Sequence, residues 1–172
     1  MTKFLPAIYF DMDGVLAKWN TKASVEDTFE RGYFLSCEPD YKMINLAKKC
    51  FSAFPSQTYI LSATYQNGYA EKEKRVWLES KGLGGLQKIF VPYGNRKEDY
   101  AKTDRPAVLI DDFSQNLHYW CEVPQHFGIK YYNGINGTKH TWTGPSLSRE
   151  MTVDEMIEKI LEISYELEEE GD

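Results

Sequence analysis

Short apolar runs recur along the chain, and the longer segments between them carry apolar residues three or four positions apart. The runs are rich in aliphatic, aromatic and β-branched residues, which is typical of buried strands. They are Ala7 to Phe10, Thr58 to Leu61, Lys88 to Val91, Ala107 to Ile110 and Ile129 to Tyr132. Strands that alternate with helices predict an α/β fold with a central parallel sheet of about five strands.

The intervening segments have the periodicity of amphipathic helices. Before the second run, one face collects Met43, Ile44, Ala47, Cys50, Phe51 and Phe54. A second helix is expected over 69–81 with its end at Gly82, and a short one over 114–122. Thr152 and Glu155 have the spacing of a capping box and precede an apolar stripe, which predicts a final helix.

The chain is predicted to form one domain over residues 1–172. It has 172 residues, of which 42% are hydrophobic, enough for one buried core and too few for two ordinary domains. Residues 16–38 lie between the first strand and its helix, and their pattern is less regular. We expect this segment, called the cap below, to be a small insertion after strand one.

Charge and apolar run length exclude several classes of protein. The net charge of -6 argues against general binding to nucleic acids. No segment approaches the roughly 18 apolar residues of a membrane helix, and Met1 to Pro6 is too short for the apolar core of a secretory signal. We therefore expect a cytoplasmic protein. The odd number of cysteines, with no Cys-x-x-Cys pair, indicates buried thiols in place of disulfides or a zinc site.

Polar side chains, one of them next to Ala63, follow the first four apolar runs. The set consists of Asp11 and Asp13 after the first run, Ser62 and Ala63 after the second, Lys97 after the third, and Asp111 and Asp112 after the fourth. Because the carboxyl ends of parallel strands meet at one edge of a sheet, these groups are expected to converge. So many carboxylates repel one another unless a cation offsets them, which predicts a divalent metal with oxygen ligands.

The order and spacing of these groups resemble the haloacid dehalogenase superfamily. Its motifs are an Asp-x-Asp strand end, a Ser or Thr strand end, a Lys and a final acidic pair. More narrowly, the sequence looks like the 5'(3')-deoxyribonucleotidase family at Asp11-Met12-Asp13-Gly14-Val15-Leu16-Ala17, at Ile110-Asp111-Asp112 and at His140-Thr141-Trp142. The resemblance implies a three-layer Rossmann-like fold and a Mg²⁺-dependent phosphatase.

The resemblance also implies roles for the acidic residues. Asp11 would be the nucleophile that forms an aspartyl-phosphate. Asp13 would protonate the leaving group and then deprotonate the attacking water. Mg²⁺ would bind to Asp11, to the backbone carbonyl of Asp13 and to Asp111, while Asp112 would be a further ligand through water or would orient the site.

The phosphate-binding groups implied by the resemblance are Ser62, Ala63 and Lys97. They would hold the oxygens of the transferred group and stabilise its charge in the transition state. Lys97 has a near rival in Lys102 and a more distant one in Lys88, since the spacing between this lysine and the final acidic pair varies in the family.

The cap is expected to decide the substrate. It is shorter than in the deoxyribonucleotidases, yet it carries Trp19, Phe29, Tyr33 and Phe34. We expect Tyr33 and Phe34 to line the pocket, where one aromatic ring stacked on a base contributes about 1–3 kcal/mol. Trp19 and Phe29 are expected to pack the cap onto the domain, and His140 to lie at the rim of the site.

Several substrates and one different class of protein are compatible with these residues. The resemblance favours a nucleoside monophosphate over a sugar phosphate or a nucleic-acid 3'-phosphate end. A phosphorylatable receiver domain also combines acidic residues, a hydroxyl and a lysine. In a receiver, however, the acidic pair follows the first strand and a single Asp follows a middle strand, whereas here Asp111 and Asp112 come late.

Overall fold

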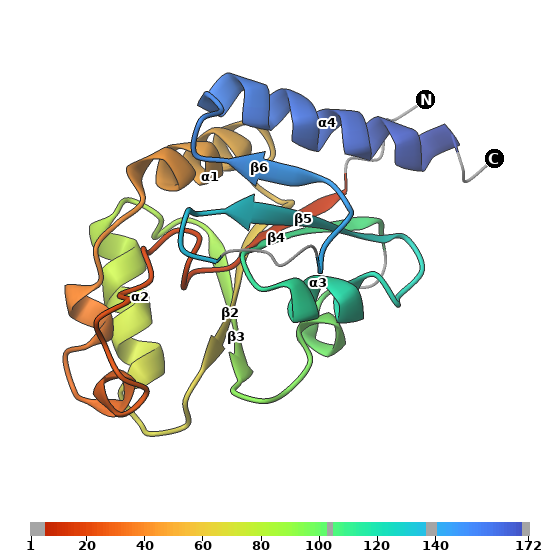
Figure 1. Ribbon diagram of the computed structural model, residues 1–172. Helices are drawn as coiled ribbons and strands as arrows, with labels where there is room; N and C mark the ends of the chain where they lie inside the picture. Colours follow the sequence, from red (N-terminus) through yellow and green to blue (C-terminus); the bar gives the residue numbers. More distant parts are fainter. Residues whose placement is uncertain (1–5, 103–104, 137–140, 170–172) are drawn as a thin grey trace.

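The computed structural model describes residues 6–102, 105–136 and 141–169, and within them the chain forms an α/β fold around a parallel sheet (Figure 1). The strands are β1 (Ala7–Phe10), β2 (Thr58–Thr64), β3 (Gln87–Pro92), β4 (Ala107–Asp111), β5 (His126–Tyr132) and β6 (Ser146–Ser148). Their order in the sheet is β3-β2-β1-β4-β5-β6. The predicted α/β class is confirmed, and β1 and β4, whose ends carry the acidic residues, are neighbours in the middle of the sheet.

The sheet has six strands where about five were expected, because β6 was not predicted. It is three residues long, and only its central Leu147 is apolar and buried. It pairs in parallel with β5 and thereby covers that edge of the sheet. Three residues are fewer than the four to eight over which alternation indicates a strand, so the hydrophobic pattern could not reveal it.

Helices cover both faces of the sheet, which gives three layers. They are α1 (Tyr41–Ala53), α2 (Ala70–Ser80), α3 (Ser114–Trp120) and α4 (Val153–Glu169). One core joins α1, α2 and α4 to sheet residues such as Ile8 and Phe10. A second core joins α3 to the opposite face, where Ala7 and Tyr9 point. Successive side chains of β1 therefore point alternately into the two cores. In Figure 1, α3 lies across the sheet from α1 and α4.

Side chains satisfy free backbone groups at the starts of α1 and α4. The Asp40 carboxylate accepts hydrogen bonds from the backbone N–H groups of Lys42 (3.1 Å) and Met43 (3.2 Å). Before α4, the Glu155 N–H donates to the Thr152 hydroxyl at 3.2 Å, and the Glu155 carboxylate accepts from the Thr152 N–H at 2.6 Å. The predicted capping box is thus confirmed.

The cap is tied to α2. It contains two short 3₁₀ helices, η1 (Glu26–Phe29) and η2 (Phe34–Ser36). The Trp77 indole N–H donates to the Cys37 carbonyl at 2.8 Å, and the Gly32 N–H donates to the Glu73 carboxylate at 2.7 Å. In Figure 1 this orange-red segment lies beside α2 at the carboxyl ends of the strands. The cap is therefore positioned next to the predicted site.

The cysteines only partly match the expectation of buried thiols. All three are free: Cys50 is buried, Cys37 is partly buried and Cys121 is exposed. Among the helices of the described residues, none combines the length and apolarity needed to cross a membrane.

Candidate functional site

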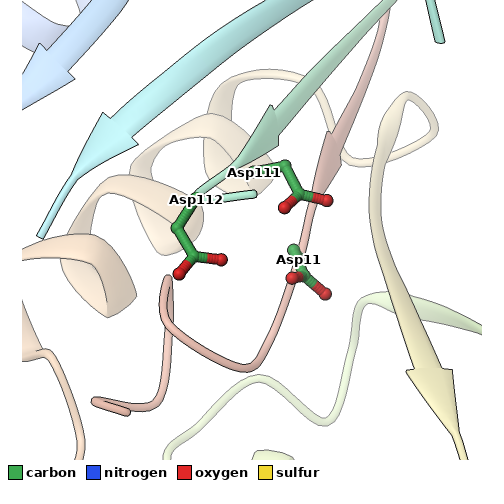
Figure 2. A group of neighbouring side chains, drawn as sticks. All are labelled: Asp11, Asp111 and Asp112. Carbon is green, nitrogen blue, oxygen red and sulfur yellow. The ribbon is translucent and has the colours of Figure 1, made fainter. Parts of the chain in front are cut away.

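Three buried carboxylates meet at the ends of β1 and β4 (Figure 2). Asp11 follows β1 directly, Asp111 is the last residue of β4, and Asp112 comes next. Because Phe10 pairs with Ile110 in the neighbouring strand, these ends are level with each other. One oxygen from each carboxylate lies within 4.8 Å of the others, and the residues are only 6%, 0% and 7% exposed. Such a group of oxygen donors could hold a metal ion.

A buried lysine offsets part of this negative charge. Lys97 begins the 3₁₀ helix η3 (Lys97–Tyr100), and its Nζ lies 2.9 Å from Asp11 Oδ1 and 2.7 Å from Asp111 Oδ2. Its rivals lie elsewhere. Lys102 is exposed, with its ammonium 3.4 Å from a glutamine oxygen of β3, and Lys88 donates to two backbone carbonyls. Among the candidate lysines, Lys97 is thus the one in contact with the acidic cluster.

One lysine does not neutralise the cluster. Burial, together with the charges of Asp111 and Asp13 and against the opposing charge of Lys97, raises the pKa of Asp11 to about 7. Burial and the charges of Asp111, Asp11 and Asp13 also raise the pKa of Asp112 well above its usual value, against the opposing charge of Lys97. Without a metal ion, ionisation of these carboxylates therefore lowers the free energy of unfolding. A divalent cation bound to these oxygens would offset that cost.

This imbalance predicts that Mg²⁺ raises the melting temperature more at pH 8 than at pH 5. The pKa of Asp11 is about 7 when folded and near 3.8 when unfolded, so the metal-free fold loses stability as pH rises through this window. A bound cation requires the ionised carboxylates and therefore acts most strongly above pH 7. Calorimetry with and without Mg²⁺ at both pH values measures the effect. Equal shifts at the two pH values would contradict a metal site at these carboxylates.

A second buried lysine lies at the end of β2. Lys74 of α2 is 1% exposed, and its ammonium forms an ion pair with the Asp13 carboxylate. The same ammonium donates to the Ser62 hydroxyl at 3.1 Å and to the Ala63 carbonyl at 2.6 Å. The structure therefore brings Asp13, Ser62 and Ala63 together around a cation that was not predicted.

The sequence contained a weak signal for this lysine. Lys74 lies in a highly charged helix, where a lysine is normally solvated. However, it lies four residues after Ala70 and three before Trp77, both of which are buried, so it is on the inward face of α2.

A third buried lysine, Lys130 of β5, donates to the Ser114 hydroxyl at 2.6 Å. Burial lowers its pKa, and the nearby acidic pair opposes that shift.

Three asparagines, also missed in the sequence, orient the acidic pair. The Asn116 amide donates to Asp111 Oδ2 at 2.9 Å, and the Asn133 amide donates to Asp112 Oδ2 at 3.1 Å. The Asn136 amide also contacts the Asp112 carboxylate. Hydrogen bonds of this kind fix the orientation of carboxylates around a metal. Asn133 and Asn136 lie in a loop, where asparagine is a common turn residue, and Asn116 lies in α3, so their role was visible only once the fold was known.

Gly14 lets the chain turn away close to Asp112. It has a φ of +80°, and a Cβ at this position would lie 2.1 Å from Asp112 Oδ2. We expect Gly14→Ala to cost about 1–3 kcal/mol from backbone strain and more from displacing Asp112. Urea unfolding measures the loss. Gly68→Ala is the matched control, because Gly68 has a φ of +81° and no atom near the added Cβ. Equal losses in the two variants, with an unchanged response to Mg²⁺, would show that Gly14 does not support the site.

The predicted substrate contacts in the cap lie close to Asp13. Phe34 is 4% exposed, and its ring centre is 4.6 Å from the Lys74 ammonium. Tyr33 is partly buried, with its ring edge-on to Phe34. Burial, with smaller contributions from Cys37 and Asp13, raises the pKa of Tyr33 to about 12. The Phe34 ring thus packs on the site's lysine and has little surface left for a base.

The other aromatic residues of the cap are less buried than expected. Trp19 and Phe29 are 45% and 44% exposed, so the prediction that they pack the cap onto the domain is wrong for Trp19 and only partly right for Phe29, whose ring lies 4.3 Å from Tyr65. The predicted rim residue His140 lies outside the described residues. Its neighbour Trp142 packs toward α3 and donates to a backbone carbonyl at 2.9 Å.

Neither a scan of protein-family models nor a search of curated proteins finds a match to this chain. The chemistry of the site therefore rests on its residues. They supply a buried strand-end carboxylate, a second carboxylate two positions along, buried ammonium groups beside both, and three carboxylates with metal-binding spacing. Such a set can bind a phosphate group, attack it and transfer protons around it.

Proposed function

We propose that this protein is a Mg²⁺-dependent phosphomonoester hydrolase that acts through an aspartyl-phosphate on Asp11. The observation that carries the proposal is the pairing of both proposed reactive carboxylates, Asp11 and Asp13, with separate buried ammonium groups. Lys97 contacts Asp11, and Lys74 contacts both Asp13 and the Ser62 hydroxyl. A nucleophile and a proton-transfer group beside buried cations are what phosphoryl transfer requires.

The reaction proceeds in two displacements. A carboxylate oxygen of Asp11 attacks phosphorus, the bond to the leaving oxygen breaks, and Asp13 donates a proton to that oxygen. Water then attacks phosphorus and gives a proton to Asp13. The bond between phosphorus and Asp11 breaks, which releases inorganic phosphate and restores both carboxyl groups.

The remaining groups bind the phosphoryl oxygens. Ser62 offers a hydroxyl, Ala63 a backbone position at the same strand end, and Lys97 and Lys74 offer positive charge. These donors stabilise charge that spreads over the oxygens in the transition state. Mg²⁺ would be held by Asp11, the Asp13 carbonyl and Asp111, with Asp112 beside them, and it would neutralise charge on the nucleophile and the phosphate.

For the substrate we infer a nucleoside monophosphate, and the resemblance to the deoxyribonucleotidases supports this choice. The low exposure of Phe34 argues against a base stacked on that ring, so another part of the molecule has to accept the leaving group. Tyr33 is only partly buried, and the charge of Asp13 contributes to its raised pKa, so Tyr33 can still contact the leaving group.

The test is release of inorganic phosphate from a panel of nucleotides, sugar phosphates and nitrophenyl phosphate. We expect turnover with Mg²⁺, loss of turnover with excess chelator and little recovery with Ca²⁺, since calcium accepts looser and higher coordination that misplaces Asp11. Full activity in chelator or in Ca²⁺, or no release from any substrate with Mg²⁺, would refute the proposal.

A further inference from the structure

A cavity of about 370 Å³ lies directly behind the loop that follows Asp11. Gly14 and Asn133 form part of its wall, and both also belong to the acidic site. The Asn133 amide donates to the Gly14 carbonyl at 2.9 Å and to the Asp112 carboxylate at 3.1 Å. The cavity and the acidic site therefore share a wall, and the cavity lies on the far side of that wall from the carboxylates.

Two cations on the wall are held by neutral oxygens. The Lys42 ammonium donates to the Met151 carbonyl at 2.8 Å and to the Arg149 carbonyl. The Arg149 guanidinium donates to the Asn133 carbonyl at 3.1 Å. Carbonyl groups fix the position of these cations, and among the described residues no carboxylate forms a direct ion pair with either of them. In a protein with a net charge of -6, this is a local concentration of positive charge.

The acidic groups nearby are engaged elsewhere. Asp40, which lines the cavity, accepts hydrogen bonds from the first N–H groups of α1 and from a tyrosine hydroxyl of β5. Lys18, also on the wall, pairs with Glu38 at the surface. Hydrogen bonds, one of them from a neighbouring hydroxyl in each case, lower the pKa values of Glu150 and Glu155. Glu150 also lies close enough to Arg149 and Lys42, and Glu155 close enough to Lys42, for these charges to lower the two pKa values further, and neither glutamate lines the cavity.

The backbone makes room for the guanidinium. Gly134 has a φ of +81°, and a Cβ there would lie 2.7 Å from Arg149 Nη1. At the mouth of the cavity, Trp19 and Tyr41 are 45% and 66% exposed, so their rings can cover the body of a bound molecule. The Trp19 ring, which was expected to pack the cap onto the domain, is thus available to contact a molecule bound in the cavity.

We infer that this cavity binds a second anionic group on the substrate, a phosphate or a carboxylate carried by the leaving group. The inference rests on the proposed phosphatase function and narrows its substrates to phosphomonoesters that bear another negative charge. Arg149 contributes the charge and the directional hydrogen bonds that a carboxylate or phosphate accepts. Trp19 contacts the atoms between the two anionic groups.

Matched substrates test this inference. The pairs are glycerol 3-phosphate with 3-phosphoglycerate, and a nucleoside 5'-monophosphate with the corresponding 3',5'-bisphosphate. The carboxylate and phosphate arms distinguish the two kinds of second anion. For at least one pair, kcat/KM is expected to be about tenfold or more higher for the member with the extra anion, the size of one charge-assisted hydrogen bond. Arg149→Gln should lower that ratio about tenfold, and Arg149→Lys should restore part of it.

Lys49→Gln is the control, because Lys49 is an exposed cation of α1 that pairs with Asp154 away from the cavity. It should leave the ratio unchanged. Equal losses on both members in Arg149→Gln, or no preference in the wild type, would overturn the inference. If no phosphomonoester is hydrolysed, the proposed function fails. The subsite is then tested on its own by measuring the binding of 3-phosphoglycerate and of glycerol 3-phosphate by calorimetry. Binding that is tighter for the first and weakened by Arg149→Gln supports the subsite, whereas equal binding overturns it.

Discussion

Replacing Asp11 by Asn is expected to lower turnover by more than about a thousandfold and, in the metal-free protein at pH 8, to raise the melting temperature. The amide cannot attack phosphorus. It also removes a buried charge that the site holds at a cost, because burial raises the pKa of Asp11 from 3.8 to about 7. The stabilisation is on the order of a few kcal/mol at most and should disappear below pH 4, where the carboxyl is neutral both folded and unfolded.

Asp13→Asn provides the contrast for this experiment. It is the same chemical change two residues along, but it removes the partner of the buried Lys74 ammonium. We therefore expect its melting temperature to fall while its turnover also falls. A fall in melting temperature in Asp11→Asn would contradict the claim that the Asp11 charge lowers stability. Retention of a tenth of wild-type activity would count against Asp11 as the nucleophile.

Replacing Lys97 by Met should have the largest effect on stability. Lys97 is 4% exposed and lies between the Asp11 and Asp111 carboxylates. Burial alone would lower its pKa, but these two carboxylates outweigh burial and raise it, so the group is a cation at neutral pH. Removing it leaves two buried negative charges unpaired, which costs about 3–5 kcal/mol in the metal-free protein. Mg²⁺ should recover part of this loss, because it supplies positive charge to the same oxygens.

Turnover should fall as well, by about a hundredfold or more, since Lys97 stabilises the transferred phosphoryl group. Urea unfolding and phosphate release measure the two effects. Lys102→Met is the matched control, because its exposed ammonium has no contact with the acidic cluster, and it should change neither. If Lys102→Met impaired turnover and Lys97→Met did not, the phosphate-binding lysine would have been assigned to the wrong residue.

The sequence predicted the parts of the fold that long apolar patterns determine. The runs ending at Phe10 and Ile110 became neighbouring buried strands, and this adjacency alone brings Asp11 next to Asp111 and Asp112. Strand ends could be predicted because parallel strands place them at one edge. The strand β6, centred on Leu147, is too short to have a pattern.

Residues that join the site from other elements were harder to find. Lys74 reaches the end of β2 only because α2 packs inward on that side, and Asn133 reaches Asp112 from the loop after β5. Both are polar residues of types that usually lie in solvent. Trp19 was misjudged for the opposite reason, since an aromatic residue was assumed to be buried and it borders a cavity instead.

The most direct test of the central claim is to trap the phosphoryl group on the protein. Asp13→Asn should slow the attack of water, because no carboxylate takes up its proton, so an acyl-phosphate should accumulate when a labelled nitrophenyl phosphate is added with Mg²⁺ and the reaction is quenched in acid. Peptide mapping by mass spectrometry then locates the label. We expect a single hydroxylamine-sensitive phosphoryl group on Asp11, absent when Asp11 is also replaced by Asn. Turnover with no label, or a label on another residue, would contradict the assignment of Asp11 as the nucleophile.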